Sequence, residues 1–138
     1  MRHVVFRVAT ERYALPLSTV REVVIPQPPF ARVPRASEAV RGVMNLRGRV
    51  VAVVDLAPLV GLPAQPLRAA TGHVLMLDTG KRALGFLIGA VLGVETIAPP
   101  ADAPHGLVRG VAPASGGAVT LLGAEALTGE AERLFGAR

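Results

Sequence analysis

The most regular pattern of apolar positions lies between Val40 and Leu56, where two apolar runs flank a short polar segment. The second run, Val50–Val54, is short and rich in β-branched residues, which indicates a strand covered on both faces rather than a helix. The segment Leu46–Arg49 predicts a tight turn between two strands, because Gly48 can supply the positive φ that such a turn usually needs. The turn would hold Arg47 at an exposed tip between two rigid strands.

The pattern predicts further strands upstream and two short helical segments. His3–Val8 is a first strand, and Tyr13–Leu17 is the strand that returns along it. The segment Ser18–Val24 is ambiguous, because it contains both a capping box, which favours a helical turn, and three valines, which favour a strand. A helical turn is expected around Pro58, since proline is tolerated in the first turn of a helix. The C-terminal segment is expected to form a short helix.

The chain contains one strand-rich unit twice. The run Val40–Val43 recurs as Val108–Val111, 68 positions later, and the same offset pairs Leu59 with Leu127. Each copy offers about five short strands, which suits a small barrel, and a copy of about 70 residues would have a thin core on its own. We therefore expect one all-β domain over residues 1–138, with a first barrel over about 1–68 and a second over about 69–138. An exchange of strands between the two stays open.

Three polar residues of the first copy are missing from the second. A feature present in only one copy need not be required by the barrel itself, so these residues are candidates for function. For each, a structural interpretation stays open: a carboxylate after a strand commonly caps a helix, an amide can be satisfied within its turn, and exposed arginines can be solubilising charges. When the two copies are aligned, Asp55 corresponds to Gly123, Arg47 to Ser115, and Asn45 to Pro113.

Charge and composition limit the classes of partner. The formal net charge is +5, with a net of +6 in residues 1–68 and −1 in residues 69–138. A basic half favours an acidic protein, an anionic membrane or a nucleic acid, but the arginines form no stripe and aromatic residues are few, so nucleic acid is the weakest of these. The longest apolar block, Ala83–Val94, has 12 residues, whereas a membrane span needs about 20. We expect a cytoplasmic protein that does not insert into a membrane.

The sequence offers no constellation for catalysis or metal binding. The absence of cysteine excludes disulfides, thiolate metal sites and cysteine nucleophiles. His3, His73 and His105 have no metal-ligand spacing, and no serine lies in a nucleophile motif. We therefore expect no enzyme activity, no cofactor and no metal.

The segment Val40–Leu56 also matches a long, ungapped pattern, and this pattern resembles the signature of CheW-like coupling proteins, which connect chemoreceptors to their histidine kinase. Ala52 stands where the family usually has proline, and Gly89 and Gly123 depart from family aspartates in the second half. The resemblance covers nearly the whole chain. The matching positions are Val40, Arg41, Gly42, Val43, Asn45, Leu46, Arg47, Gly48, Val50, Val51, Val53, Asp55 and Leu56.

The resemblance implies two packed five-stranded SH3-like barrels with a receptor-binding groove between them. It also implies a non-catalytic adaptor whose partners are the cytoplasmic tip of a methyl-accepting chemoreceptor and the regulatory domain of a CheA-type histidine kinase. The alternative is a small β-barrel module that binds nucleic acid or an anionic ligand. The site residues carried over are Arg47, Glu22, Val20 and Asn45 for the receptor, Gly42 and Val43 for the kinase, and Asp55 and Gly48 as capping or structural residues.

Overall fold

The computed structural model of the chain describes residues 1–26, 30–31, 39–65, 72–78, 83–98 and 106–136. These residues form ten strands, one 3₁₀ turn and two α-helices. In chain order the elements are β1 (Arg2–Val8), β2 (Glu11–Pro16), η1 (Leu17–Thr19), β3 (Val20–Val24), β4 (Val40–Leu46), β5 (Arg49–Asp55), α1 (Leu56–Leu59), β6 (His73–Leu77), β7 (Leu84–Ile88), β8 (Ala90–Thr96), β9 (Val108–Ala114), β10 (Gly117–Leu122) and α2 (Ala124–Gly136).

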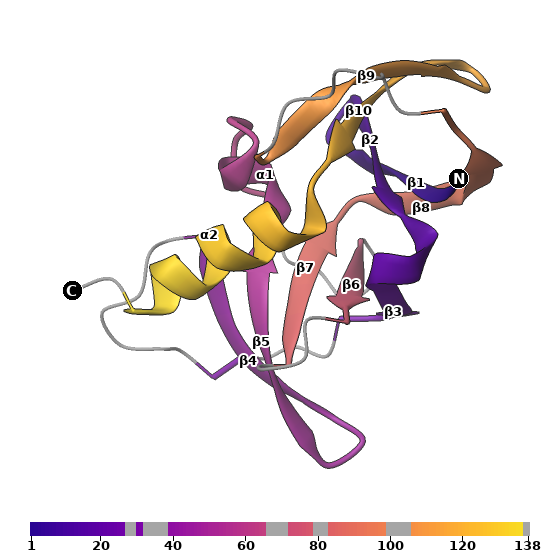
Figure 1. Ribbon diagram of the computed structural model, residues 1–138. Helices are drawn as coiled ribbons and strands as arrows, with labels where there is room; N and C mark the ends of the chain where they lie inside the picture. Colours follow the sequence, from indigo (N-terminus) through magenta and orange to yellow (C-terminus); the bar gives the residue numbers. More distant parts are fainter. Residues whose placement is uncertain (27–29, 32–38, 66–71, 79–82, 99–105, 137–138) are drawn as a thin grey trace.

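The strands form two five-stranded sheets, which confirms the predicted all-β, SH3-like architecture (Figure 1). Sheet A has the strand order β8-β1-β2-β10-β9, and sheet B has the order β3-β6-β7-β5-β4. Neither described sheet is closed by pairing of its two outer strands, so each is a curled, open barrel. Each sheet takes strands from both halves of the chain, because the hairpin β1–β2 joins sheet A and the hairpin β6–β7 joins sheet B. The expected boundary near residue 68 lies outside the described residues.

The internal repeat is visible in the backbone hydrogen bonds. The amide of Asp55 donates to the carbonyl of Ala39 at 2.7 Å, and the amide of Gly123, 68 positions after Asp55, donates to the carbonyl of Leu107 at 2.9 Å. Each sheet also contains one parallel pair, β5 with β7 and β10 with β2. These parallel pairs join strands from different halves, so the two halves are interlocked rather than stacked.

The apolar core has one large cluster between the sheets and a smaller cluster inside each. The large cluster contains Phe6, Leu15 and Phe86, and the helix α2 covers it with Leu127. Successive residues of β5 point to opposite faces of the strand: Val54 belongs to the large cluster, whereas Val51 and Val53 belong to the cluster inside sheet B. The strand predicted to be covered on both faces is therefore buried from Val51 onward, while Val50 is exposed.

In the ambiguous segment Ser18–Val24, the strand interpretation is correct from Val20 onward, and the helical turn ends at Thr19, where the capping box predicted one to begin. Leu17–Thr19 form a 3₁₀ turn, and Val20–Val24 form β3. The hydroxyl of Thr19 donates to the carbonyl of Pro16 at 2.7 Å, which stabilises the turn. The expected C-terminal helix is present as α2, and no helix in the described part of the chain is long and apolar enough to cross a membrane.

Candidate binding site at the β4–β5 turn

The hairpin of β4 and β5 extends beyond the rest of sheet B and ends in a two-residue turn (Figure 1). Arg47 has a φ of +51° and Gly48 a φ of +85°. Positive φ at both central residues is the requirement of a type I′ turn, whose twist matches that of the flanking strands. The amide of Gly48 donates to Oδ1 of Asn45 at 2.8 Å, so Asn45 fastens the turn through its side chain.

The predicted receptor-binding residues Arg47 and Glu22 are brought together by an ion pair. Nη2 of Arg47 lies 2.6 Å from Oε1 of Glu22, and the Arg47 side chain is 67% exposed. Glu22 lies on β3, at the opposite edge of sheet B from β4. The pair therefore ties the hairpin tip to the far edge of the curled sheet and leaves most of the guanidinium open to solvent.

Exposed apolar side chains lie on the two elements that this ion pair connects. Val23 is on β3 and Ile25 follows it, and both are exposed. Val50 follows the turn on β5 and is 69% exposed. Val20, also predicted to bind the receptor, is half-buried and packs against the large core cluster. The strands that carry the ion pair thus also expose apolar side chains, although Val23 points to the opposite face of β3 from Glu22.

Gly42, predicted to take part in kinase binding, lies against another segment of this chain. The backbone that approaches this glycine belongs to Ala31 of the same chain. A Cβ atom on Gly42 would lie 2.4 Å from the Ala31 carbonyl oxygen, and its φ is +131°. Ala31 and Val43 exchange hydrogen bonds of 3.0 and 2.8 Å across this contact. Gly42 is buried, whereas Val43 is half-buried.

Asp55 is a fully buried carboxylate that organises the segment after β5. Its oxygens accept from the amide of Ala57 at 3.1 Å, from the amide of Gln65 at 2.7 Å and from Nε2 of Gln65 at 2.7 Å. Nε2 of Gln65 also donates to the carbonyl of Leu87, and Nη1 of Arg41 lies 3.7 Å from Oδ2 of Asp55. Asp55 therefore caps α1 and anchors the following coil to β7. Sequence reasoning missed Gln65 because this residue belongs to no recognisable motif.

The second copy has an equivalent tie, but its turn residue Ser115 carries no guanidinium of its own. Oε1 of Glu95, on β8, accepts from the amide of Ser115 at 2.8 Å, just as Glu22 on β3 accepts from Arg47. The carbonyl of Ser115 accepts from Nη2 of Arg12 at 2.5 Å. In both sheets a glutamate from one outer strand holds the hairpin tip at the other edge. The guanidinium at the second tip belongs to the half-buried Arg12 of β2, whereas in the first copy the exposed turn residue Arg47 carries it.

No group of three His, Asp or Glu side chains in the described part of the chain converges closely enough to hold a metal ion. His105 lies outside that part. His3 is buried, and its Nδ1 lies 3.0 Å from the carbonyl of Met1, so its ring is engaged at the start of β1.

Comparison with known proteins places this geometry in a family. The profile of the CheW-like domain matches residues 2–132. Chemotaxis protein CheW of Thermotoga maritima is 36% identical over 76 residues, which cover 55% of this chain and 49% of that protein. Chemotaxis protein CheW of Rhizobium meliloti is 32% identical over 95 residues, 68% of this chain and 59% of that protein. Protein PilI of Pseudomonas aeruginosa is 29% identical over 90 residues, 65% of this chain and 49% of that protein.

The chain matches about half to three fifths of the length of these curated relatives, from 49% to 59%. The crystal structure of the scaffolding protein TtCheW from Thermoanaerobacter tengcongensis superposes with a TM-score of 0.72 at 25% identity, over 88% of each chain. The family profile matches nearly every residue, and the solved structure has the same fold. Both observations agree with the signature around the β4–β5 turn. The chain therefore belongs to the CheW-like family.

Proposed function

We propose that the protein is a non-catalytic adaptor that couples chemoreceptors to a CheA-type histidine kinase in a cytoplasmic signalling array. The match of residues 2–132 to the CheW-like domain carries this proposal. It is supported by the similar solved structure, which is that of a scaffolding protein. The comparisons do not favour the alternative of a nucleic-acid or anion-binding module.

The receptor-binding surface that we propose is centred on Arg47. An amphipathic helix from the cytoplasmic tip of a receptor would lay its apolar face on exposed apolar side chains such as Val23 and Val50, as in other helix-in-groove complexes. A carboxylate on this receptor helix would bind the guanidinium of Arg47, either beside Glu22 or in its place, because a guanidinium offers five N–H donors. Val20 and Asn45 would support this surface, since Val20 anchors β3 to the core and Asn45 fixes the turn.

The kinase-binding surface that we propose lies along the edge strand β4. Among the described residues, its outer edge pairs through the bridge between Ala31 and Val43, and the regulatory domain of the kinase would contact this edge. Val43 is the candidate contact. Gly42 would act indirectly, because its lack of a Cβ lets Ala31 approach and fixes the position of β4.

The test is receptor binding by Arg47 variants. Arg47→Ala and Arg47→Glu should keep the unfolding midpoint of the parent, because an exposed ion pair contributes about 0–1 kcal/mol. Binding to a receptor fragment that contains the cytoplasmic tip, measured by calorimetry, should weaken by at least about tenfold, since a partner carboxylate loses its charge partner in a desolvated interface.

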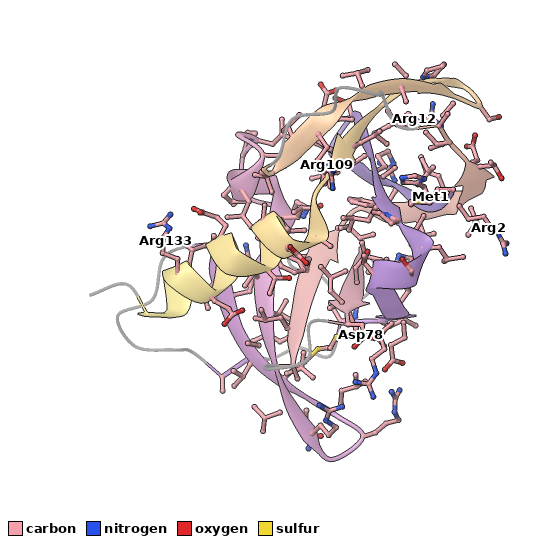
Figure 2. The ribbon with its side chains drawn as sticks, viewed as in Figure 1. Met1, Arg2, Arg12, Asp78, Arg109 and Arg133 are labelled. Carbon is pink, nitrogen blue, oxygen red and sulfur yellow. The ribbon has the colours of Figure 1, made fainter. Side chains whose placement is uncertain are left out.

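The matched control is Arg133→Ala, which removes an exposed, ion-paired arginine from α2, far along the chain from the turn. Its side chain points away from the sheets (Figure 2). Full receptor affinity in both Arg47 variants would reject the role of Arg47. If neither a receptor nor a histidine kinase co-purified with the tagged protein from its native host, the adaptor proposal itself would be rejected.

A further inference from the structure

The hairpin of β4 and β5 leaves sheet B at Ala52 (Figure 1). The pairing of β5 with its neighbour β7 runs from Ala52 to Asp55, although β5 itself begins at Arg49. Among the described residues, the part of β5 before Ala52 therefore has β4 as its one neighbouring strand. We call the segment Leu46–Val51 the overhang, and Arg47 lies at its turn.

One backbone hydrogen bond marks the base of the overhang. The amide of Ala52 donates to the carbonyl of Ala83, directly before β7, at 3.0 Å. The strand β4 does not accept from this amide: Val43, the partner of Ala52 on β4, exchanges its backbone hydrogen bonds with Ala31. At such a position of an antiparallel pair, both residues direct their amides away from each other. The bond from Ala52 to Ala83 is therefore independent of the β4–β5 ladder.

This hydrogen bond depends on the identity of residue 52. Ala52 stands where the family usually has proline, and proline has no N–H to donate. The alanine thus gives this chain one more hydrogen bond between β5 and the start of β7. A proline at this position would remove that bond and leave the hydrogen bonds between β4 and β5 in place.

A small change at the base of the overhang moves its tip by a large distance. Arg47 is five residues from Ala52, which is about 17 Å along a strand at about 3.4 Å per residue. A rotation of the overhang by about 10° would shift Arg47 by about 3 Å, whereas a binding group must be held to within about 0.5 Å. The ion pair with Glu22 does not replace the base, because an exposed ion pair holds weakly and a receptor carboxylate would bind the same guanidinium.

We propose that Ala52 is a positioning residue for receptor binding: its amide fixes the direction of the overhang and so holds Arg47 where a receptor carboxylate meets it. This inference rests on the receptor-binding role proposed above for Arg47. Side-chain packing also holds the overhang, since Val51 is buried in the cluster inside sheet B. Apolar contacts are non-directional, however, whereas a hydrogen bond fixes an angle. A fixed overhang also loses less freedom when the receptor binds, which favours affinity.

The first experiment measures the direction of the overhang in the full ¹⁵N-labelled chain. Residual dipolar couplings report how each amide is oriented relative to the whole molecule. In the parent, the couplings of the overhang should fit the same alignment tensor as those of β7. In Ala52→Pro, the couplings of the overhang should decrease while those of β7 stay the same. If the overhang of the parent is already averaged, the base bond does not fix it and the proposal is wrong, even if no variant folds.

The second experiment measures receptor affinity at a temperature where all variants are folded. Calorimetry with a receptor fragment that contains the cytoplasmic tip should show a loss of about threefold or more in Ala52→Pro. Ala52→Ser keeps the amide and nearly the same volume, so it should bind as the parent does. Val119→Ala lowers the unfolding midpoint through the core of sheet A and is the control for lost stability. Parental affinity in Ala52→Pro would overturn the proposal, and so would an equal loss in Val119→Ala.

The same change in an Arg47→Ala background separates this proposal from the proposed function. If Ala52 acts through Arg47, Ala52→Pro should cause no further loss of affinity once Arg47 is removed. An equal loss in both backgrounds would overturn the positioning role. Full affinity in Arg47→Ala alone would instead reject the receptor-binding role of Arg47. A loss in Arg47→Ala with parental affinity in Ala52→Pro would reject the positioning role and leave the proposed function in place.

Discussion

Replacement of Asp55 by alanine should destabilise the protein more than any other removal of a single charge among the described residues. The buried carboxylate accepts three hydrogen bonds and lies near the guanidinium of Arg41. A hydrogen bond to a charged group contributes about 1.5–3 kcal/mol, so three would set a ceiling of about 4.5–9 kcal/mol. Removing the charge also relieves its cost of burial, and deletion of one partner from such a network usually costs about 3–5 kcal/mol.

We therefore expect Asp55→Ala to lower the free energy of unfolding by about 3–5 kcal/mol, a large share of the roughly 5–15 kcal/mol that stabilises a domain. Urea unfolding followed by circular dichroism should show a lower midpoint with an unchanged slope. Asp55→Asn should lose about 2 kcal/mol, because its amide nitrogen cannot accept a hydrogen bond. Arg47→Ala is the control and should lose less than about 1 kcal/mol. A loss below about 1 kcal/mol for Asp55→Ala would refute the role assigned to the network.

Further predictions concern two glycines of the backbone, one leucine of the core and the ionisation of Tyr13. Gly42→Ala should cost more than about 2 kcal/mol, since its Cβ would collide with a backbone oxygen, whereas Gly48→Ala, with open space around it, should cost about 1–2 kcal/mol. Leu127→Ala should cost about 2–5 kcal/mol in thermal unfolding by leaving a cavity under α2. Burial, and secondarily the charge of Glu11, raises the pKa of Tyr13, so the fold favours the neutral phenol. The free energy of unfolding should keep its full value below a pH of about 10 and decrease as the pH rises through the raised pKa of Tyr13. Urea unfolding at a series of pH values should show a smaller decrease in Tyr13→Phe, which has no phenol to ionise.

The β4–β5 hairpin could be predicted from the sequence because every signal for it is local. The β-branched run specifies the strand, and Gly48 next to Arg47 specifies a turn with positive φ. The exposure of Arg47 follows from its place at the tip. Its contact with Glu22 does not follow, because it depends on how far the sheet curls, and this is decided by strand pairings between distant segments.

The buried network around Asp55 shows where the comparison of the two copies misleads. Asp55 has a glycine as its counterpart, and this difference suggested a functional role. In the structure the difference reflects the segment that comes after each strand: a single helical turn and an anchored coil after Asp55, and the long helix α2 after Gly123. A Cβ on Gly123 would also lie 2.5 Å from the carbonyl oxygen of Gly106. Local packing thus excludes an aspartate there, and the asymmetry says nothing about partners.

The exchange of hairpins between the halves changes how the remaining asymmetry should be interpreted. Because β1–β2 completes the sheet of the second half and β6–β7 that of the first, neither half can bury its core alone, and the two sheets keep a fixed relation. Both hairpin tips are held by a glutamate from the opposite edge, Glu22 in one sheet and Glu95 in the other, so this tie is a requirement of the shared fold. At the second tip, Glu95 accepts from the backbone amide of Ser115, and the guanidinium of Arg12, from β2, donates to the Ser115 carbonyl. Arg47 differs from Arg12 because it carries its guanidinium on the exposed turn itself, and this is why we propose Arg47 as the contact for a partner outside the chain.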